Sequence, residues 1–373
     1  MPKPLDGILE NAHFEGIPAI QACAIHDGTM LYSGESGSAS NASIFDVASV
    51  TKMAATTLSA CVLNARGLLK LDATLGSFFP DLKKSHKGIQ VRHLLAHSSG
   101  LPAWQPFFTE ALCTTNRPAY ADARARTIQA VKNALPEHAP GEKRIYSDTG
   151  FILLGLILEL AGTAPLNDLA QELVFGPAGL KHTQFFPLEQ ALPNVHIIPT
   201  GSTRPREPAP GQETLFNVPK QPNVLDPGQV DDDNAYALGG VAGHAGLFST
   251  ASDLASLGQT LIEDTQGANH LGTGDRLRHF LRPDHGPEGP LRALGFDLVA
   301  TQGSSTGSRW GKGSKGGFGH LGFTGCALWV DLDRQLTAAL LSNRVLPGRA
   351  NINAVRALRP AFFDGVISAI ETD

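Results

Sequence analysis

The sequence has few of the features that mark metal-binding or disulfide-stabilised proteins. Its four cysteines are scattered and form no C-x-x-C pair, so a zinc site or a dense disulfide framework is not expected and free thiols are the default. The 13 histidines include no H-E-x-x-H pattern. His93 and His97 have the i, i+4 spacing of metal ligands, but no carboxylate pattern accompanies them. We therefore predict no metal and no cofactor.

The start of the chain and its charge argue against a secreted, membrane or nucleic-acid-binding protein. Residues 1–7 lack the basic region, apolar run and cleavage site of a signal peptide. The most apolar helical stretch, 151–158, is too short to cross a bilayer. The net charge of -5 gives no electrostatic reason to expect nucleic acid or an anionic membrane as a partner. We predict a cytoplasmic protein with a small-molecule substrate; the oligomeric state stays open.

Two familiar catalytic or cofactor motifs are absent or out of place. No G-x-S-x-G elbow occurs, which argues against an α/β-hydrolase. Residues 311–316 match G-x-G-x-x-G, but they follow a polar stretch and precede a predicted strand instead of opening a helix. We interpret 311–316 as a loop beside His320, not as a dinucleotide site.

What is present is the profile of a soluble globular enzyme. The chain has 373 residues, of which 42% are hydrophobic and 17% charged, and this length suggests two structural units or one domain with a large insertion. We find no internal repeat. Apolar runs on both sides of Asp27-Gly28 predict a hairpin over 17–34, and 318–343 reads as strands that turn at 331–334.

Helical patterns fill most of the chain between these strands. Spacing of apolar residues predicts one helix from Ser49 to about Arg66, stopped by Gly67, and Thr250 can cap another. A closing helix is predicted over 352–370, with Pro360 interrupting it. Further helical spacing occurs in residues 91–96, 123–134 and 149–161.

Strands at both ends of the chain with helices between them predict an α+β protein. We expect a sheet domain formed by residues 1–67 and 235–373, and a mainly helical domain formed by residues 68–234. Residues 196–233 are rich in proline, glycine and polar residues and are predicted to be a long surface loop. The cleft between the two units is the expected place for an active site.

Ser49 and Lys52 form an S-x-x-K pair at the point where a sheet-like stretch turns into a helix. Three residues are nearly one helical turn, so both side chains project from one face and can share a proton. A serine hydroxyl needs a neighbouring base to become a nucleophile, and a helix start favours a developing anion. Alone the pair is weak evidence, since a capping serine and a solvated lysine would look the same.

Two further segments carry chemistry. Tyr146 and Asp148 precede an apolar helix, and a lysine near the phenol would lower its pKa and make Tyr146 a candidate base. The alternative is a packed tyrosine with Asp148 as a helix cap. Residues 319–325 open a strand after a glycine-rich approach, so the backbone can come close to a substrate and His320 can contact it.

These three segments resemble, in their order, the S-x-x-K, Y-x-N and K-T-G or H-x-G motifs of the serine β-lactamase and penicillin-binding-protein superfamily. The similarity is greatest to its class C-like branch, which includes the family VIII carboxylesterases. It extends over about residues 15–345, with framework similarity in 91–102 and 237–250. The resemblance implies an antiparallel sheet flanked by helices, with a helical domain inserted beside it.

The resemblance also implies roles for individual residues. Ser49 would form an acyl-enzyme, Lys52 and Tyr146 would transfer the proton, and the backbone N–H groups of Ser49 and Phe323 would form the oxyanion hole. Asp148, His320, Leu321 and Gly322 would contact the substrate.

Two departures from the family pattern affect these roles. Asp148 stands where the family often has asparagine, which should raise the pKa of Lys52. His320 replaces a common lysine and so removes a fixed charge for a substrate carboxylate.

The leading hypothesis is a carboxylesterase that acts on small esters. A β-lactamase or a D-amino-acid peptidase would share the chemistry, with an amide or β-lactam as substrate. A protein of another class also remains open, namely a non-catalytic penicillin-binding-like receptor that kept the fold and uses the cleft to bind a ligand.

Overall fold

The computed structural model describes residues 3–109, 120–201, 204, 226–300 and 304–371. Its centre is a six-stranded antiparallel sheet of order β2-β1-β9-β8-β7-β6. The strands are β1 (Ala19–His26), β2 (Thr29–Gly37), β6 (Asp297–Leu298), β7 (Gly317–Leu321), β8 (Ala327–Asp331) and β9 (Leu336–Ser342). Because β1 pairs with β9, the two ends of the chain meet inside the sheet. The predicted α+β fold with an antiparallel sheet and flanking helices is confirmed.

Both predicted hairpins form. The chain turns between β1 and β2 at Asp27 and Gly28, whose φ angles are 48° and 73°. Such positive φ angles at both central residues suit a tight hairpin, which explains the Asp-Gly sequence. Residues 332–335 connect β8 to β9.

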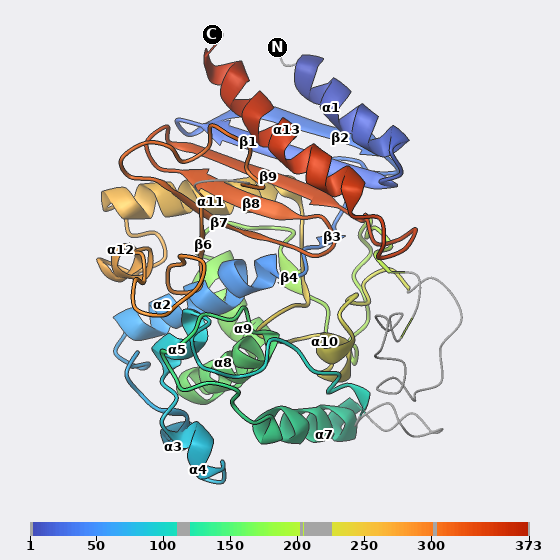
Figure 1. Ribbon diagram of the computed structural model, residues 1–373. Coiled ribbons are helices and arrows are strands. Elements are labelled where there is room, and N and C mark those ends of the chain that lie inside the picture. The colour runs from blue at the N-terminus through green and yellow to red at the C-terminus, as the bar shows by residue number, and fades with distance from the viewer. Residues whose placement is uncertain (1–2, 110–119, 202–203, 205–225, 301–303, 372–373) are drawn as a thin grey trace.

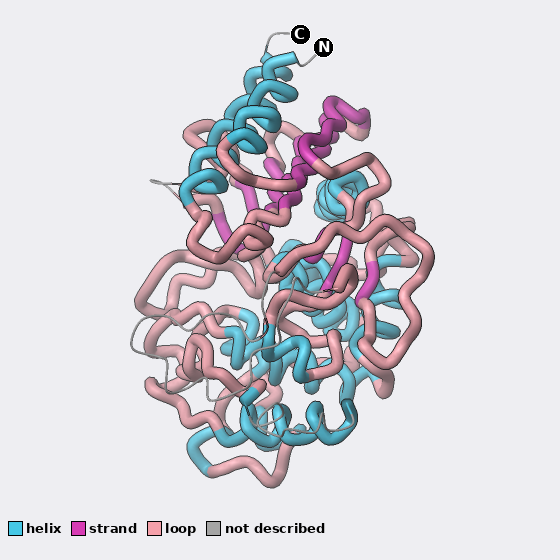
Figure 2. The backbone as a smooth tube through the Cα atoms, turned by 90° about the vertical axis from the view of Figure 1, so that its right-hand side faces the viewer, coloured by secondary structure: helices cyan, strands magenta, loops and turns pink. Residues whose placement is uncertain are grey.

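Helices cover both faces of this sheet (Figures 1 and 2). On one face lie α1 (Lys3–Phe14) and α13 (Asn353–Glu371), and on the other lies α11 (Ala251–Gln266). The hydroxyl of Thr250 accepts a hydrogen bond from the Asp253 N–H at 3.1 Å, as predicted for a helix cap.

One prediction for the chain ends is wrong, and one helix has no counterpart among the predictions. The closing helix forms as α13, but it runs through Pro360 without a break; α1 was not predicted. Phe362 and Phe363, which follow the proline, are both buried against the sheet together with Leu358 on its other side. This packing holds both halves of α13 in place despite the missing backbone N–H.

Short helices and a small second sheet form the rest of the described chain. Helix α8 is apolar on all sides and mostly buried, which fits a central core helix. The helices are η1 (Lys52–Thr57), α2 (Leu58–Ala65), α3 (Leu75–Phe78), α4 (Lys84–Lys87), α5 (Val91–Leu95), α7 (Tyr120–Asn133), α8 (Asp148–Gly162), α9 (Leu166–Ala170), η2 (Gln171–Phe175), α10 (Asp233–Ala237) and α12 (Arg276–Phe280). The small sheet has the order β3-β5-β4, formed by β3 (Phe45–Asp46), β4 (Gln184–Phe185) and β5 (Leu247–Ser249).

The predicted helices at 91–96, 123–134 and 149–161 correspond to α5, α7 and α8. In the described ranges no single helix is long and apolar enough to span a membrane. Together, α8 and the segment Leu166–Phe175 are long and apolar enough by length and composition, but the chain bends by 76° between them. The described cysteines, Cys23, Cys61 and Cys326, are free and buried; Cys113 lies outside the described residues.

The helix that follows Ser49 differs from the prediction in its first turns. Instead of an α-helix throughout, residues Lys52–Thr57 form the π-helix η1, and α2 follows. A π-helix widens each turn by one residue and often occurs at functional sites. Gly67, with φ of 75°, follows the end of α2 as predicted.

The predicted surface loop 196–233 is only partly described, since 202–203 and 205–225 lie outside the described residues. Its described ends are partly buried: His196, Asp226 and Pro227 are exposed, but other residues are not. Ile198 is 1% exposed. Arg204, equally buried, pairs with Asp233 at 2.9 Å and lies over the ring of Tyr236 at 3.7 Å. The surface position of the loop as a whole stays a prediction, as do the residue boundaries of the two domains.

Candidate active site

The structure brings Ser49 and Lys52 into direct contact. Lys52 is the first residue of η1, and its Nζ donates hydrogen bonds to Ser49 Oγ and to the carbonyl oxygen of His244, both at 3.0 Å. The lysine is completely buried, whereas Ser49 is partly exposed. A lysine held in this way is oriented toward the serine and has no access to bulk water.

Tyr146 and Asp148 reach the same point from the start of α8. Between them, Ser147 caps this helix, because its Oγ accepts the Gly150 N–H at 3.0 Å. The Nζ of Lys52 lies 2.8 Å from Asp148 Oδ1 and 4.8 Å from the centroid of the Tyr146 ring. Asp148 therefore forms an ion pair with the buried lysine.

Burial and charge set the protonation of this group. Burial alone would lower the pKa of the Lys52 ammonium, but the Asp148 carboxylate outweighs this effect, and the pKa lies above its usual value. This is the direction expected from the sequence. Burial also raises the pKa of the Tyr146 phenol, although Lys52 and Ser49 oppose the rise. The expectation of a lowered tyrosine pKa is wrong, since burial and Asp148 outweigh the lysine charge.

His97 is a part of the site that the sequence analysis did not assign. Its ring stacks against those of Tyr146 at 4.5 Å and Phe151 at 4.8 Å. Its Nδ1 accepts the N–H of Ser147 at 2.9 Å, which leaves the ring proton on Nε2. Burial holds the pKa of His97 well below its usual value, so the ring is neutral. The signal in the sequence was the i, i+4 pair with His93, but its meaning depends on the contact with Tyr146.

Phe323 lies two residues after the end of β7 and is 47% exposed. Within the described residues, neither the Ser49 N–H nor the Phe323 N–H donates a hydrogen bond to another protein group. The preceding residue, Gly322, lies so close to the backbone of Val47 that a side chain would not fit. A Cβ at position 322 would lie 2.4 Å from the carbonyl oxygen of Val47. This approach brings the segment of Phe323 next to the segment that carries Ser49.

His320 and Leu321 lie at the end of β7. Nδ1 of His320 donates to the carbonyl oxygen of Leu321 at 2.8 Å. The ring of His320 is 6.0 Å from that of Tyr146 and only 2% exposed. Burial lowers the pKa of His320 to about 4, although Asp297 opposes the shift. This histidine is therefore uncharged near neutrality, unlike a lysine at the same place.

A pocket of about 150 Å³ surrounds the exposed side of Ser49. Of the predicted site residues, Ser49, Tyr146, Asp148 and Phe323 line it, while Lys52 lies beneath and donates to Ser49. The lining is formed by Asp46, Ala48, Ser49, Tyr146, Asp148, Asp231, Asp232, His244, Ala245, Phe323 and Arg349. His320, Leu321 and Gly322 belong to the neighbouring strand end and are not among these described lining residues.

Much of the pocket wall was missed by sequence reasoning. Asp231 pairs with Arg349 at 2.7 Å, and Asp232 pairs with the His244 Nε2 at 2.8 Å. The run of three aspartates at 231–233 and the glycine-rich turn around His244 were visible signals. Only the tertiary fold shows that they meet at Ser49, because nothing in their spacing points to the distant S-x-x-K pair.

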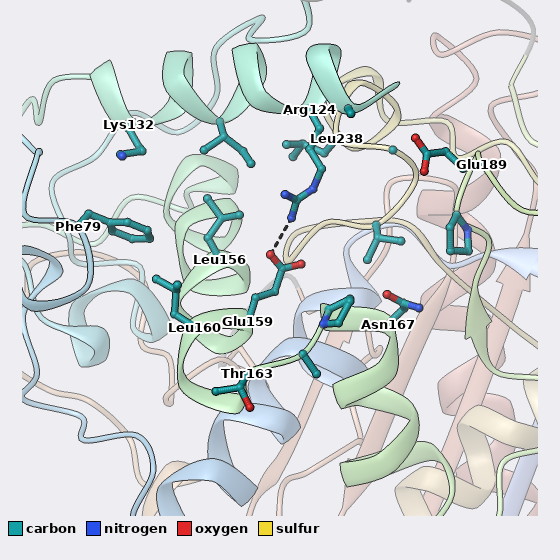
Figure 3. A pocket seen from close by; sticks show the side chains of 17 residues that line it. Phe79, Arg124, Lys132, Leu156, Glu159, Leu160, Thr163, Asn167, Glu189 and Leu238 are labelled. Carbon is teal, nitrogen blue, oxygen red and sulfur yellow. Dashed lines mark hydrogen bonds and ion pairs between the residues drawn. The ribbon is translucent and has the colours of Figure 1, made fainter. Parts of the chain in front are cut away.

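A larger cavity lies elsewhere in the described chain. It has a volume of about 680 Å³ and lies between α7, α8 and α9 (Figure 3). Arg124 and Glu159 form an ion pair of 2.7 Å between two of its walls. Its described lining contains no serine or cysteine, so size alone does not identify the active site.

The glycine-rich loop 311–316 binds a side chain of the protein itself. The N–H groups of Lys315 and Gly316 donate to Asp333 Oδ2 at 2.8 and 3.0 Å. These donors, which a dinucleotide phosphate would need, are thus occupied by a carboxylate. Among the described residues, no group of three or more histidine, cysteine, aspartate or glutamate side chains could hold a metal ion.

Comparisons with known proteins agree with this arrangement. The Beta-lactamase family model matches residues 5–361. A protein of Escherichia coli K12 named "Putative D-alanyl-D-alanine carboxypeptidase" is 30% identical over 331 residues, which cover 86% of this chain and 73% of that protein.

Two solved structures share the fold. The D-amino acid amidase from Ochrobactrum anthropi SV3, complexed with L-phenylalanine amide, has a TM-score of 0.70 at 18% identity and covers 99% of this chain and 97% of its own. The hydrolase EstCE1, described as having promiscuous acyltransferase activity, has a TM-score of 0.68 at 20% identity, with coverage of 97% and 98%. With a serine and a lysine in contact at the mouth of a pocket, and with a family model that spans nearly the whole sequence, the chain belongs to the β-lactamase family of serine hydrolases.

Proposed function

We propose that the protein is a carboxylesterase that hydrolyses small esters through an acyl-enzyme on Ser49. The observation that carries this proposal is the 3.0 Å contact between Lys52 Nζ and Ser49 Oγ beside a pocket lined by Tyr146. A buried amine next to a hydroxyl and a phenol provides a route for the serine proton. The small pocket, about 150 Å³, suits a short acyl group.

The neutral state of His320 favours esters over β-lactams. A fixed cation would attract the carboxylate of a penicillin or of a C-terminal peptide, and burial keeps this histidine uncharged near neutrality. A neutral substrate has no carboxylate that a cation at this position would bind, so its binding is not weakened by the neutral histidine. At the position of His320, small esters are therefore favoured over anionic substrates.

The proposed acylation uses Lys52 and Tyr146 as one coupled pair, which must first lose one proton because both groups are protonated at rest. The pair then accepts the Ser49 proton as Oγ forms a bond to the ester carbonyl carbon. The N–H groups of Ser49 and Phe323 bind the carbonyl oxygen as it becomes negative. Collapse breaks the C–O bond, and the pair returns the proton to the leaving alkoxide. Water then hydrolyses the acyl-enzyme by the reverse sequence.

The test compares the wild type with Ser49→Ala on short-chain p-nitrophenyl esters, followed by intact-mass detection of the acylated enzyme. We expect a mass increase equal to one acyl group in the wild type and none in the variant, with turnover reduced at least about 10³-fold. Equal turnover by both proteins would refute the nucleophile. A receptor without catalysis would show neither turnover nor labelling of Ser49 by a fluorophosphonate probe.

A second candidate is hydrolysis of amides or peptides of small D-amino acids. The observation in its favour is the acidic part of the pocket wall, where Asp231 and Asp232 line the pocket and pair with Arg349 and His244. Carboxylates there would attract the free ammonium group of an amino-acid substrate. Some of the related proteins carry names of this activity, namely a D-alanyl-D-alanine carboxypeptidase and a D-amino acid amidase. A kcat/KM for D-alanine amide or D-Ala-D-Ala peptides above that for neutral esters would decide for this candidate.

A further inference from the structure

The backbone directly before the nucleophile is held in an unfavourable conformation. Ala48 has φ of 48°, in the left-handed region that residues with a Cβ rarely adopt. The residue at this position is an alanine and not a glycine, so the strain is not relieved. A residue that keeps such a conformation needs neighbours that fix it.

Two side chains supply these contacts. The Thr51 hydroxyl donates to the carbonyl oxygen of Ala48 at 2.6 Å, and Asp46 binds the Ala48 N–H. The Oδ1 of Asp46 accepts the N–H of Ala48 at 2.8 Å, and its Oδ2 accepts the N–H of Asp231 at 2.7 Å. The backbone carbonyl oxygen of Asp46 also accepts the hydroxyl of Thr324 at 2.8 Å. Asp46 is 1% exposed. This single residue therefore joins the turn before Ser49, a segment of the pocket wall, and the neighbour of Phe323.

We propose that Asp46 is a positioning residue of the active site, which fixes Ala48 in its left-handed conformation and so aims Ser49 at the pocket. It acts through Ala48, and through Thr324 it holds the segment of Phe323 at the correct distance. The Ser49 N–H thus depends on the Asp46 carboxylate, and the segment of Phe323 depends on the backbone carbonyl of the same residue. The inference rests on the proposed role of Ser49 as the nucleophile.

The ionised form of Asp46 is the form that suits these contacts. Two N–H donors point at its two oxygens, so a carboxylate satisfies both, while an acid or an amide presents a hydrogen to one of them. Burial raises the pKa of Asp46 to about 7; the N–H groups of Asp231 and Ala48 oppose this shift, and the carboxylates of Asp231 and Asp232 add to it. The Cys326 thiol also lies nearby, with its Sγ 3.5 Å from the Asp46 carbonyl oxygen. Further titratable or charged groups line the same pocket, namely Tyr146, Asp148, His244 and Arg349. Near neutrality the contacts are therefore sensitive to pH.

The experiment measures the rate of Ser49 labelling by a fluorophosphonate probe, together with ester turnover. In Asp46→Asn we expect the labelling rate and kcat to fall about 10- to 100-fold with little change in KM. The reason is that the orientation of Ser49 is lost while substrate binding is kept. In the double variant with Ala48→Gly most of the loss should be recovered, because glycine adopts a positive φ without support. Rescue by glycine is a result that a merely structural role for Asp46 would not give.

A matched control is Asp264→Asn. Asp264 is also buried, and its two oxygens accept the N–H groups of His270 and Leu271 at 2.5 and 3.0 Å, but it does not line the pocket. We expect this variant to label at the wild-type rate. Loss of labelling in both variants to the same extent would indicate general destabilisation and overturn the proposal, as would unchanged labelling of Asp46→Asn.

A separate measurement uses the variant Ala48→Gly, which keeps the Asp46 carboxylate. The wild-type labelling rate should fall as the pH drops through about 7, and Ala48→Gly alone should weaken this dependence. An unchanged pH dependence in Ala48→Gly would overturn the proposal even where Asp46→Asn fails to fold. If the wild type is not labelled at Ser49, the proposed function fails; if it is labelled and the variants behave alike, only the role of Asp46 fails.

Discussion

The ion pair between Lys52 and Asp148 allows a quantitative prediction. Replacing Asp148 by asparagine removes one negative charge at 2.8 Å from the lysine Nζ and nearly preserves the shape of the side chain. Asp148 raises the pKa of both Lys52 and Tyr146. Its removal should therefore lower the pKa of the base, whichever of the two residues acts as the base. In Asp148→Asn, the coupled pair should lose its proton at a lower pH than in the wild type.

The size of this change follows from Coulomb's law. At 2.8 Å a unit charge pair interacts by about 1.5 kcal/mol in water and by about 6 kcal/mol at an effective dielectric constant of about 20. Divided by about 1.4 kcal/mol per pH unit, the range is about 1 to 4 units. Because the Asp148 side chain is 21% exposed, solvent screens part of this energy. We expect a shift of about 1 to 2 units.

The assay is the pH profile of kcat/KM for a p-nitrophenyl ester between about pH 6 and pH 10, corrected for hydrolysis without enzyme. The readout is the position of the rising limb, not the height of the plateau, because the substitution can also alter substrate binding. The exposed Asp168 provides a control, and Asp168→Asn should leave the limb in place. A limb that stays fixed or moves to higher pH in Asp148→Asn would contradict the role of the Lys52–Tyr146 pair.

Three further predictions concern packing and protonation. Gly322→Ala forces a Cβ to within 2.4 Å of the Val47 carbonyl oxygen, so labelling of Ser49 should slow at least about tenfold, while far-ultraviolet circular dichroism stays unchanged. Leu261→Ala empties a fully buried position of α11 and should lower the free energy of unfolding by about 2–5 kcal/mol in urea titrations. Asp46 has a raised pKa in the folded state, about 7, so its favourable contribution is fully present below about pH 4 and is lost as the pH rises through about 7. Relative to Asp46→Asn, the wild type should lose up to about 4 kcal/mol of unfolding free energy across this interval; a constant difference would count against the raised pKa.

The sequence allowed the sheet to be predicted, because strands and their turns are encoded locally. Asp27-Gly28 and the alternating runs around it predict one hairpin, and the pairing of β1 with β9 follows from strands at both chain ends. Helix α13 was misjudged because a proline rule is local, whereas the packing of Phe362 and Phe363 is tertiary. The π-turns of η1 have no sequence pattern that distinguishes them from α-helical turns.

The same division holds for the candidate site. Ser49, Lys52 and Tyr146 lie in short motifs, so each could be found without coordinates. The protonation of Tyr146 could not be predicted from the sequence, because its pKa depends on a degree of burial that residue spacing does not reveal. His97 and Asp46 contribute through one ring contact and two backbone contacts. Such contacts involve residue types that are common throughout the chain.

The insertion of β9 beside β1 affects the order in which the protein becomes functional during synthesis. Ser49 leaves the ribosome early, but β1 lacks its neighbour on one side until residue 342 has been made. Nascent chains therefore carry an unpaired strand edge for most of translation, and such edges promote aggregation. A chain truncated before β9 should be both inactive and dependent on chaperones, whereas a circular permutant that joins the adjacent helices α1 and α13 would place these strands close together in the new sequence.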